Sequence, residues 1–169
     1  MAEQRKSKPK VEKETSSDFE EKVLYINRCS KVVKGGRKFS FSALILVGDG
    51  KGQVGVGFAK ANEVADAIRK GSECARKNLF TFELEGDTIP HEACFKWDGA
   101  QVMLKPAREG TGVIAGSHIR SVLEAGGVKN VVAKSLGCNN AKNQVIAACK
   151  ALQSLRSRSS ALALRGENV

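Results

Sequence analysis

Glycines flanked by positive charge form the part of this sequence best suited to binding chemistry. Residues 34–38 read Lys-Gly-Gly-Arg-Lys and stand just before an alternating strand pattern that begins at Phe39. Glycine lets an extended backbone come close to a partner, and the cations beside it attract negative charge. The segment holds no histidine, serine, cysteine or carboxylate that could act as a base or a nucleophile. It therefore predicts binding of a polyanion rather than catalysis.

The excess positive charge of the chain is confined to two segments. Of its 169 residues, 28 are Lys or Arg and 18 are Asp or Glu, which gives a net charge of +10. Residues 22–48 hold six cations and no acid, and residues 125–166 hold seven cations and no acid. The rest of the sequence holds 15 cations against all 18 acids. This separation favours two surfaces that contact one polyanion, with nucleic-acid phosphate as the obvious candidate; two ordinary solvated faces are the alternative.

Composition argues against membrane, secretory and metal-dependent functions. No run of about 18 apolar residues is present, and the charged N-terminus lacks the apolar stretch of a secretory signal. The five cysteines show no Cys-x-x-Cys spacing, and His91 and His118 lie far apart in the sequence. We therefore predict no membrane partner, no metal, no cofactor and no enzymatic activity, with reduced, mostly buried thiols in a cytoplasmic protein.

The apolar pattern of residues 19–82 predicts three strands followed by a helix. We expect strands at residues 22–33, 39–47 and 53–59, with a tight glycine turn at 48–52. In the second strand, apolar residues recur at period two, so one face should pack inward: Phe39, Phe41, Ala43, Ile45 and Val47. The helix should start after Asn62 as its N-cap and run to about Asn78, with its buried side formed by Val64, Ile68, Ala75 and Leu79.

Residues 93–155 predict a second unit of strands and helices. Strands are expected at 93–97, 101–105 and 130–134, and helices at 117–125 and about 141–155. Residues 83–92 are acidic, contain Gly86 and Pro90, and are interpreted as a linker. Residues 1–18 are expected to be a disordered tail and residues 156–169 a C-terminal tail. The predicted fold class is α+β, with two small domains.

Two glycine motifs have the spacing of nucleotide-binding loops. Gly50-x-Gly52-x-x-Gly55 matches a dinucleotide fingerprint, but strand residues follow it where that motif requires a helix. Residues 106–116 are similar to the start of the phosphate loop in the galactokinase–homoserine kinase family. The hydroxyl residues that continue that loop are replaced here by Val113-Ile114-Ala115-Gly116. A phosphotransferase that uses residues 110–116 stays an alternative, although we interpret His118 as a helix-surface residue rather than a base.

Two long, ordered motifs resemble the bacterial-type ribosomal protein S5 family of the small subunit. The first reads Val33-Lys34-Gly35-Gly36-Arg37-Lys38-Phe39-Ser40-Phe41 and continues as Val47-Gly48-Asp49-Gly50-x-Gly52-x-Val54-Gly55-x-Gly57. The second reads Glu109-Gly110-Thr111-Gly112-x-Ile114-Ala115-Gly116 and Val122-Leu123-Glu124-x-x-Gly127-Val128-x-Asn130-Val131. The resemblance covers roughly residues 19–155.

This resemblance implies both a fold and a function. The N-terminal domain, residues 19–82, should be similar to a double-stranded-RNA-binding fold without its first helix, and residues 93–155 should form a split β-α-β domain. The implied function is that of a structural constituent of the small ribosomal subunit, which binds small-subunit ribosomal RNA where the head meets the body and supports translational accuracy. Implied partners are ribosomal proteins S4 and S8, and messenger RNA near the point where it enters the subunit. The basic loop at residues 30–38 should lie near the spectinomycin site.

Candidate RNA-binding residues fall into two groups. The first group comprises Arg28, Lys31, Lys34, Gly35, Gly36, Arg37 and Lys38, together with Lys51 and Lys60 further along the same half. The second group comprises Lys134, Asn139, Asn140, Lys142 and Asn143. The asparagine amides could reach sugars or base edges, or they could cap the following helix, and both interpretations stay open. A free-standing RNA chaperone with the same surfaces is a third function that fits the charge pattern.

Overall fold

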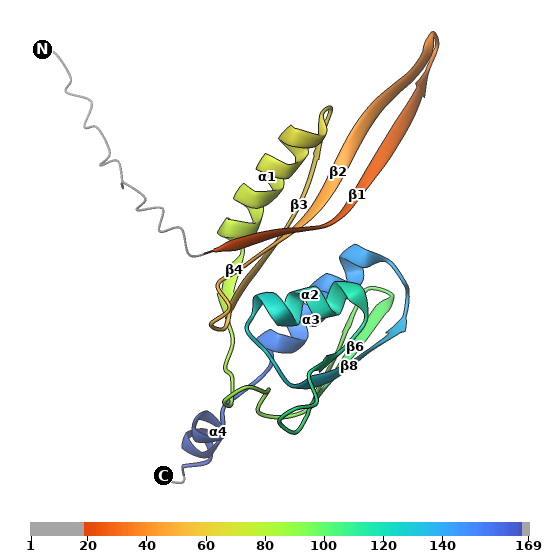
Figure 1. The fold of residues 1–169 in the computed structure, drawn as a ribbon. Helices are drawn as coiled ribbons and strands as arrows, with labels where there is room; N and C mark the ends of the chain where they lie inside the picture. Colours follow the sequence, from red (N-terminus) through yellow and green to blue (C-terminus); the bar gives the residue numbers. More distant parts are fainter. Residues whose placement is uncertain (1–18, 167–169) are drawn as a thin grey trace, which may run out of the picture.

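The computed structural model describes residues 19–166, which form two four-stranded β-sheets and four helices (Figure 1). The disordered tail expected at residues 1–18 lies outside the described residues, as do residues 167–169. Within the described part, the predicted α+β fold class is confirmed.

The first sheet is built from the N-terminal half in sequence order. It contains β1 (Glu20–Val33), β2 (Gly36–Gly48), β3 (Gln53–Ala61) and β4 (Leu79–Thr81), and each strand is antiparallel to its neighbour. Helix α1 (Val64–Lys77) lies against one face of this sheet (Figure 1). Beyond the sheet, β1 and β2 continue as a long two-stranded hairpin.

Strand β2 is buried on both faces over its second half. Ala43, Ile45 and Val47 pack against α1. Leu44 and Leu46, which point to the opposite face, belong to a second apolar cluster that includes the C-terminal half. The predicted inward face is therefore present at residues 43, 45 and 47, but its first member, Phe39, is 48% exposed on the hairpin.

The C-terminal half forms the second sheet and two covering helices. Its strands are β5 (Ala93–Trp97), β6 (Ala100–Pro106), β7 (Val113–Ile114) and β8 (Val131–Gly137), arranged in the order β5-β6-β8-β7. Strands β7 and β8 are parallel and are joined through α2 (Ser117–Ala125), which makes a β-α-β unit. Helix α3 (Ala141–Gln153) follows β8, and apolar residues of both helices are buried in the shared cluster.

The two halves meet through backbone hydrogen bonds at a glycine-rich junction. The amide of Gly50 donates to the carbonyl of Ala125, and the amide of Gly52 donates to that of Gly126, both at 3.0 Å. Gly127 has a φ of +82°, and a Cβ there would clash with the carbonyl of Gly50. The apparent dinucleotide motif is thus a docking turn between the two halves.

Two further glycines, Gly55 of that motif and Gly57 after it, allow close packing of α1. A Cβ at Gly55 would clash with the carbonyl oxygen of Ala75, and one at Gly57 would clash with that of Gly71. Helix α1 can therefore approach the backbone of β3 directly. This requirement explains why glycine recurs in a strand, where it otherwise weakens the structure.

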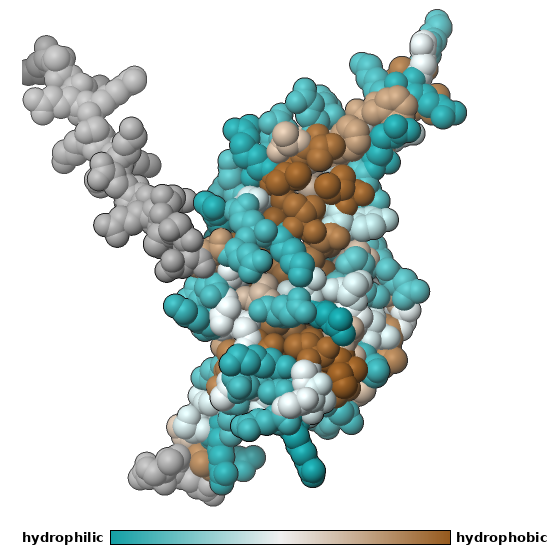
Figure 2. Space-filling model, in the orientation of Figure 1, coloured by the Kyte–Doolittle hydropathy of each residue, from teal (hydrophilic) through white to brown (hydrophobic). Residues whose placement is uncertain are grey.

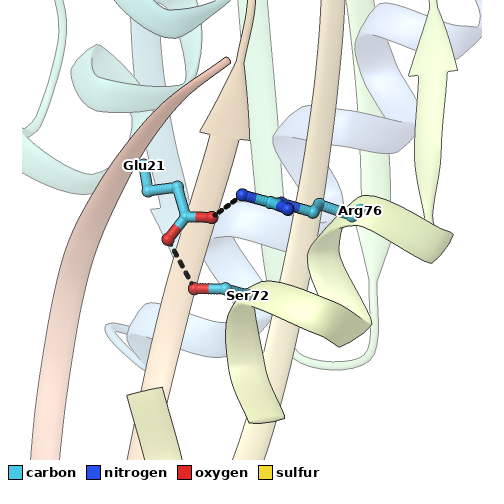
Figure 3. Close-up of polar contacts among 3 residues, drawn as sticks. All are labelled: Glu21, Ser72 and Arg76. Carbon is cyan, nitrogen blue, oxygen red and sulfur yellow. Dashed lines mark hydrogen bonds and ion pairs between the residues drawn. The ribbon is translucent and has the colours of Figure 1, made fainter. Parts of the chain in front are cut away.

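The start of β1 is fixed to helices on both sides. Ser72 Oγ donates a hydrogen bond to Glu21 Oε2 at 2.7 Å, and Arg76 Nη2 donates to Glu21 Oε1 at 2.8 Å (Figure 3). On the other side, Lys22 Nζ lies 3.3 Å from Glu124 Oε2 of α2. These contacts hold the start of β1 between α1 and the C-terminal half.

The segment between the two halves is packed rather than extended. Ile89 is buried, and the Thr88 hydroxyl donates to the carbonyl of Asn130 at 2.7 Å. After α3, the chain forms α4 (Arg158–Arg165), where no element was expected. The carboxylate of Glu83 accepts hydrogen bonds from the Ser157 amide and the Ser160 hydroxyl, and the bonds from Ser157 hold the pKa of Glu83 below its ordinary value.

Several local predictions were wrong. The N-cap of α1 is Glu63 rather than Asn62, and the predicted helix residue Leu79 belongs to β4, from which it still packs against the α1 core. Strand β7 was not predicted. The cysteines are not mostly buried, because only Cys149 of the five is buried.

We predict that Gly127→Ala lowers the free energy of unfolding by about 2 kcal/mol or more, because it combines a positive φ with a backbone clash at the junction. Gly86→Ala is the matched control, since Gly86 has a φ of +63° with nothing within 4 Å of a Cβ. The control should lose only the conformational part, about 1 kcal/mol. Urea unfolding of both variants measures the difference, and equal losses would contradict a role for the junction.

We also predict that Glu21→Ala destabilises the fold by about 1 kcal/mol, because it leaves the buried Ser72 hydroxyl and Arg76 without their acceptor. Glu92→Ala removes an exposed carboxylate that lies 3.6 Å from Lys105 and should cost less than about 0.5 kcal/mol. Thermal unfolding at low salt compares the two. If Glu21→Ala lowers the stability no more than Glu92→Ala does, the contacts of Glu21 do not hold β1.

Candidate nucleic-acid interface

A two-stranded arm projects from the first sheet. Pairing between β2 and β3 begins at Phe41 and Ala61, so residues 29–40 of the hairpin pair only with each other. We call these residues the arm; in Figure 1 it points away from the rest of the molecule. Its surface mixes hydrophilic and hydrophobic patches (Figure 2), and Val32 and Phe39 are among its exposed apolar residues.

The tip of the arm is a two-residue turn, not the longer loop that the sequence suggested. Val33 pairs with Gly36, which leaves only Lys34 and Gly35 in the turn. Gly36 has a φ of +147°, and no atom lies within 4 Å of a Cβ at either glycine. The backbone at the tip is therefore open, and a partner can approach it closely.

The cations of the arm are exposed and unneutralised. Lys31 and Lys38 face each other across the hairpin, and Arg37 lies opposite Val32. Within residues 19–166, the five ion pairs all involve other cations. Like charges placed directly opposite each other destabilise a strand pair, so an anion bound at the arm would relieve repulsion.

A groove of about 670 Å³ lies between the base of the arm and the N-terminal end of α3. Its walls come from β1, β2 and β3 on one side and from α2 and the residues around the start of α3 on the other. The two acid-free segments of the sequence meet here. Among residues 19–166, no Asp or Glu lines the groove, so its electrostatic character favours an anionic ligand.

Both aromatic rings and cations line the groove. The Nζ atoms of Lys142 and Lys60 lie 4.8 and 5.9 Å from the centroid of Phe58. The rings of Tyr25 and His118 meet edge to face at 6.3 Å. Arg28 borders the groove, but its guanidinium lies 4.6 Å from the centroid of Phe39, on the arm.

The asparagines of the second predicted group serve different purposes. Asn140 caps α3, because its Oδ1 accepts a hydrogen bond from the Lys142 amide at 3.2 Å. Asn143 donates to Asp98 Oδ2 at 2.8 Å. Asn139 lines the groove and is exposed. Capping thus accounts for Asn140, which also lines the groove.

The structure brings most, but not all, of the predicted residues together. Those on the arm are Lys31, Lys34, Gly35, Gly36, Arg37 and Lys38, and those at the groove are Arg28, Lys60, Asn139, Asn140 and Lys142. Lys51 lies in the β2–β3 turn, roughly 40 Å along β2 from the tip. Lys134 follows the buried Ala133 on β8 and so points to the sheet face away from the helices. These two residues and Asn143 do not join the groove.

Sequence reasoning missed several residues of the groove. Tyr25 and Phe58 were interpreted only as strand residues, and His118 only as a helix-surface residue. Tyr25 is the only tyrosine of the chain and stands inside an acid-free segment, which is the one signal that could have marked it.

Comparison with known proteins identifies the family. Sequence models of the N-terminal and C-terminal domains of ribosomal protein S5 match residues 19–83 and 95–165. The chain belongs to the ribosomal protein S5 family. This is a family of structural ribosomal proteins and not of enzymes, which removes the phosphotransferase alternative.

Relatives named small ribosomal subunit protein uS5 match along most of their length. A protein of Chlamydia abortus is 71% identical over 148 residues, which cover 87% of this chain and 90% of the relative. One of Protochlamydia amoebophila is 61% identical over 166 residues, with 98% and 99% covered. One of Chlamydia trachomatis is 67% identical over 138 residues, with 81% and 84% covered.

Other site types find no support in the described part of the chain. No cluster of three or more His, Cys, Asp or Glu side chains in residues 19–166 is placed to hold a metal ion. In the same residues, no helix is long and apolar enough to cross a bilayer. The amide of Gly112, in the loop similar to a phosphate loop, already donates to Asn130 Oδ1 at 3.0 Å.

We predict that Cys29 reports on occupancy of the groove, because it lines the groove and is exposed. Iodoacetamide at pH 8 should modify Cys29 and the exposed Cys94 in the native chain. Burial raises the pKa of Cys149 to about 12, so this thiol should react only after unfolding. Ribosomal RNA should slow modification of Cys29 but not that of Cys94, as measured by mass spectrometry. Equal protection of both would contradict the assigned interface.

Proposed function

We propose that this chain is a structural constituent of the small ribosomal subunit that binds small-subunit ribosomal RNA through the arm and the groove. The observation that carries the proposal is the unneutralised charge of the arm, continued by a groove with cations and no acid. A nucleic-acid strand carries a phosphate at every nucleotide. Two cationic surfaces that join each other can therefore bind several phosphates of one strand.

The arm and the groove have features that suit RNA. Lys31, Lys34, Arg37 and Lys38 would contact phosphates, while the open glycine backbone lets the tip approach closely. The deep major groove of A-form RNA hides its bases from side chains, so phosphate contacts would position the protein and RNA shape would supply selectivity.

The finer parts of the proposal rest on the family resemblance. The chain would lie in the cytoplasmic ribosome where the head of the small subunit meets its body, contact ribosomal proteins S4 and S8, and border the path by which messenger RNA enters. In that place it would support translational accuracy. The anchoring of the start of β1 by Glu21 and Lys22 favours this structural role, because it fixes the strand from which the arm extends.

Binding to ribosomal RNA should depend strongly on salt. If about six phosphates are neutralised, the logarithm of the affinity should fall with a slope of about 4–5 against the logarithm of salt concentration. We predict that Lys34→Glu with Arg37→Glu lowers the affinity at least tenfold and reduces this slope by about 2. Filter binding to small-subunit ribosomal RNA measures both quantities.

The control variant changes the same net charge elsewhere. Lys70→Glu with Lys77→Glu lies on the exposed side of α1, away from the arm and the groove. It should change the affinity by less than about threefold, through the long-range field alone. Equal losses for both variants would show that binding follows net charge and not the arm. Co-sedimentation with the small subunit after a high-salt wash separates a ribosomal constituent from a free-standing RNA chaperone.

A further inference from the structure

A β-bulge turns Tyr25 into the groove. Before the bulge, Val23 pairs with Ile45, which packs against α1. After it, Tyr25 pairs with Leu44, which faces the C-terminal half. In an unbroken register Leu24 would pair with Leu44 and Tyr25 with Ala43, which would direct Tyr25 to the α1 side. Bulges commonly redirect a side chain next to a functional site.

The ring of Tyr25 is in contact with His118 but stays half exposed. Tyr25 is 49% exposed, and its ring makes an edge-to-face contact with that of His118. A stacking face is thus available inside a groove whose size falls in the range of pockets that hold small organic molecules. Phe58 differs, because Lys60 and Lys142 already lie near its ring.

The remaining lining groups match the other parts of a nucleotide. Lys60 and Lys142 line the same groove as Tyr25 and bring positive charge that can neutralise a phosphate. Asn27 and Asn139 bring amides that can donate to and accept from a base edge or a ribose hydroxyl. An acidic peptide would use the lysines but would leave the aromatic face and the amides without a role.

We infer that the groove takes one unpaired nucleotide of the bound RNA, with its base stacked on Tyr25 and its phosphate between Lys60 and Lys142. This inference rests on the proposed binding of ribosomal RNA. Single-stranded segments and bulges offer bases that can leave the helix and stack on aromatic side chains. A base held in this way is recognised by shape and stacking.

Ultraviolet cross-linking of small subunits that contain the wild-type chain tests the inference without any mutation. We expect a nucleotide adduct on Tyr25 or on His118, located by mass spectrometry of the digested protein. The attached nucleotide should be unpaired in the RNA secondary structure. Adducts confined to the arm, with none at Tyr25, His118 or Asn139, would overturn the inference.

A pair of variants supplies a second test. Small subunits that carry Tyr25→Ala or Tyr25→Phe are probed with reagents that together modify the Watson–Crick edges of all four bases. In Tyr25→Ala, at least one unpaired base should become about tenfold more reactive, since stacking on one aromatic ring is worth about that factor in occupancy. Tyr25→Phe keeps the ring and should match the wild type. Identical reactivity in all three subunits would overturn the inference.

Failure of this inference differs from failure of the proposed function. If the wild-type chain does not co-sediment with small subunits, the proposed function itself fails. If the chain co-sediments and its arm cross-links to RNA while the groove does not, only the nucleotide pocket fails. Should Tyr25→Ala not be incorporated, the wild-type cross-link alone decides.

Discussion

Strand β2 is buried on both faces over residues 42–48, and the same strand continues outward to form one half of the arm. A two-stranded hairpin is marginally stable in water when it stands alone. Here its base is a central strand held between α1 and the C-terminal half, with Glu21 and Lys22 fixing the partner strand to helices on either side. The arm is therefore ordered before binding, which lowers the entropy that an RNA complex has to lose.

Glycine in this chain has two roles that its sequence spacing does not distinguish. At the tip, Gly35 and Gly36 leave open space that a partner can use. At Gly55 and Gly127 the same absence of a side chain lets backbone meet backbone within the fold. The second role accounts for the glycine spacing that imitates a dinucleotide fingerprint, because the turn it forms is occupied by the carbonyls of residues 125 and 126.

Much of the fold could be predicted from the apolar periodicity of the sequence. The features that could not be predicted depend on contacts between residues far apart in the sequence. The longer strands, the first three helices and the basic character of the arm could be predicted, since each depends on neighbouring residues, whereas β4, β7 and α4 were not predicted. The pattern in β2 showed only one buried face, because the burial of Leu44 and Leu46 requires the C-terminal half. Likewise, the groove joins residues about 115 positions apart in sequence, and the bulge that points Tyr25 into it has no periodic signal. Helix α4 depends on Glu83, a distant partner that composition could not reveal.

The two parts of the interface differ in what they can distinguish. The arm offers charge and open backbone, which bind any closely spaced phosphates with little regard for sequence. Its facing pair, Lys31 and Lys38, repels itself in the free protein, so the arm gains most from an anion that reaches both side chains. The groove adds an exposed aromatic face and amides to its cations, and these contact groups other than phosphate. Affinity should therefore depend mainly on the arm, whereas the choice of RNA site should depend on the geometry around Tyr25. Because the bulge sets that geometry through the backbone, a change of register in β1 would alter selectivity while leaving the charge of the surface unchanged.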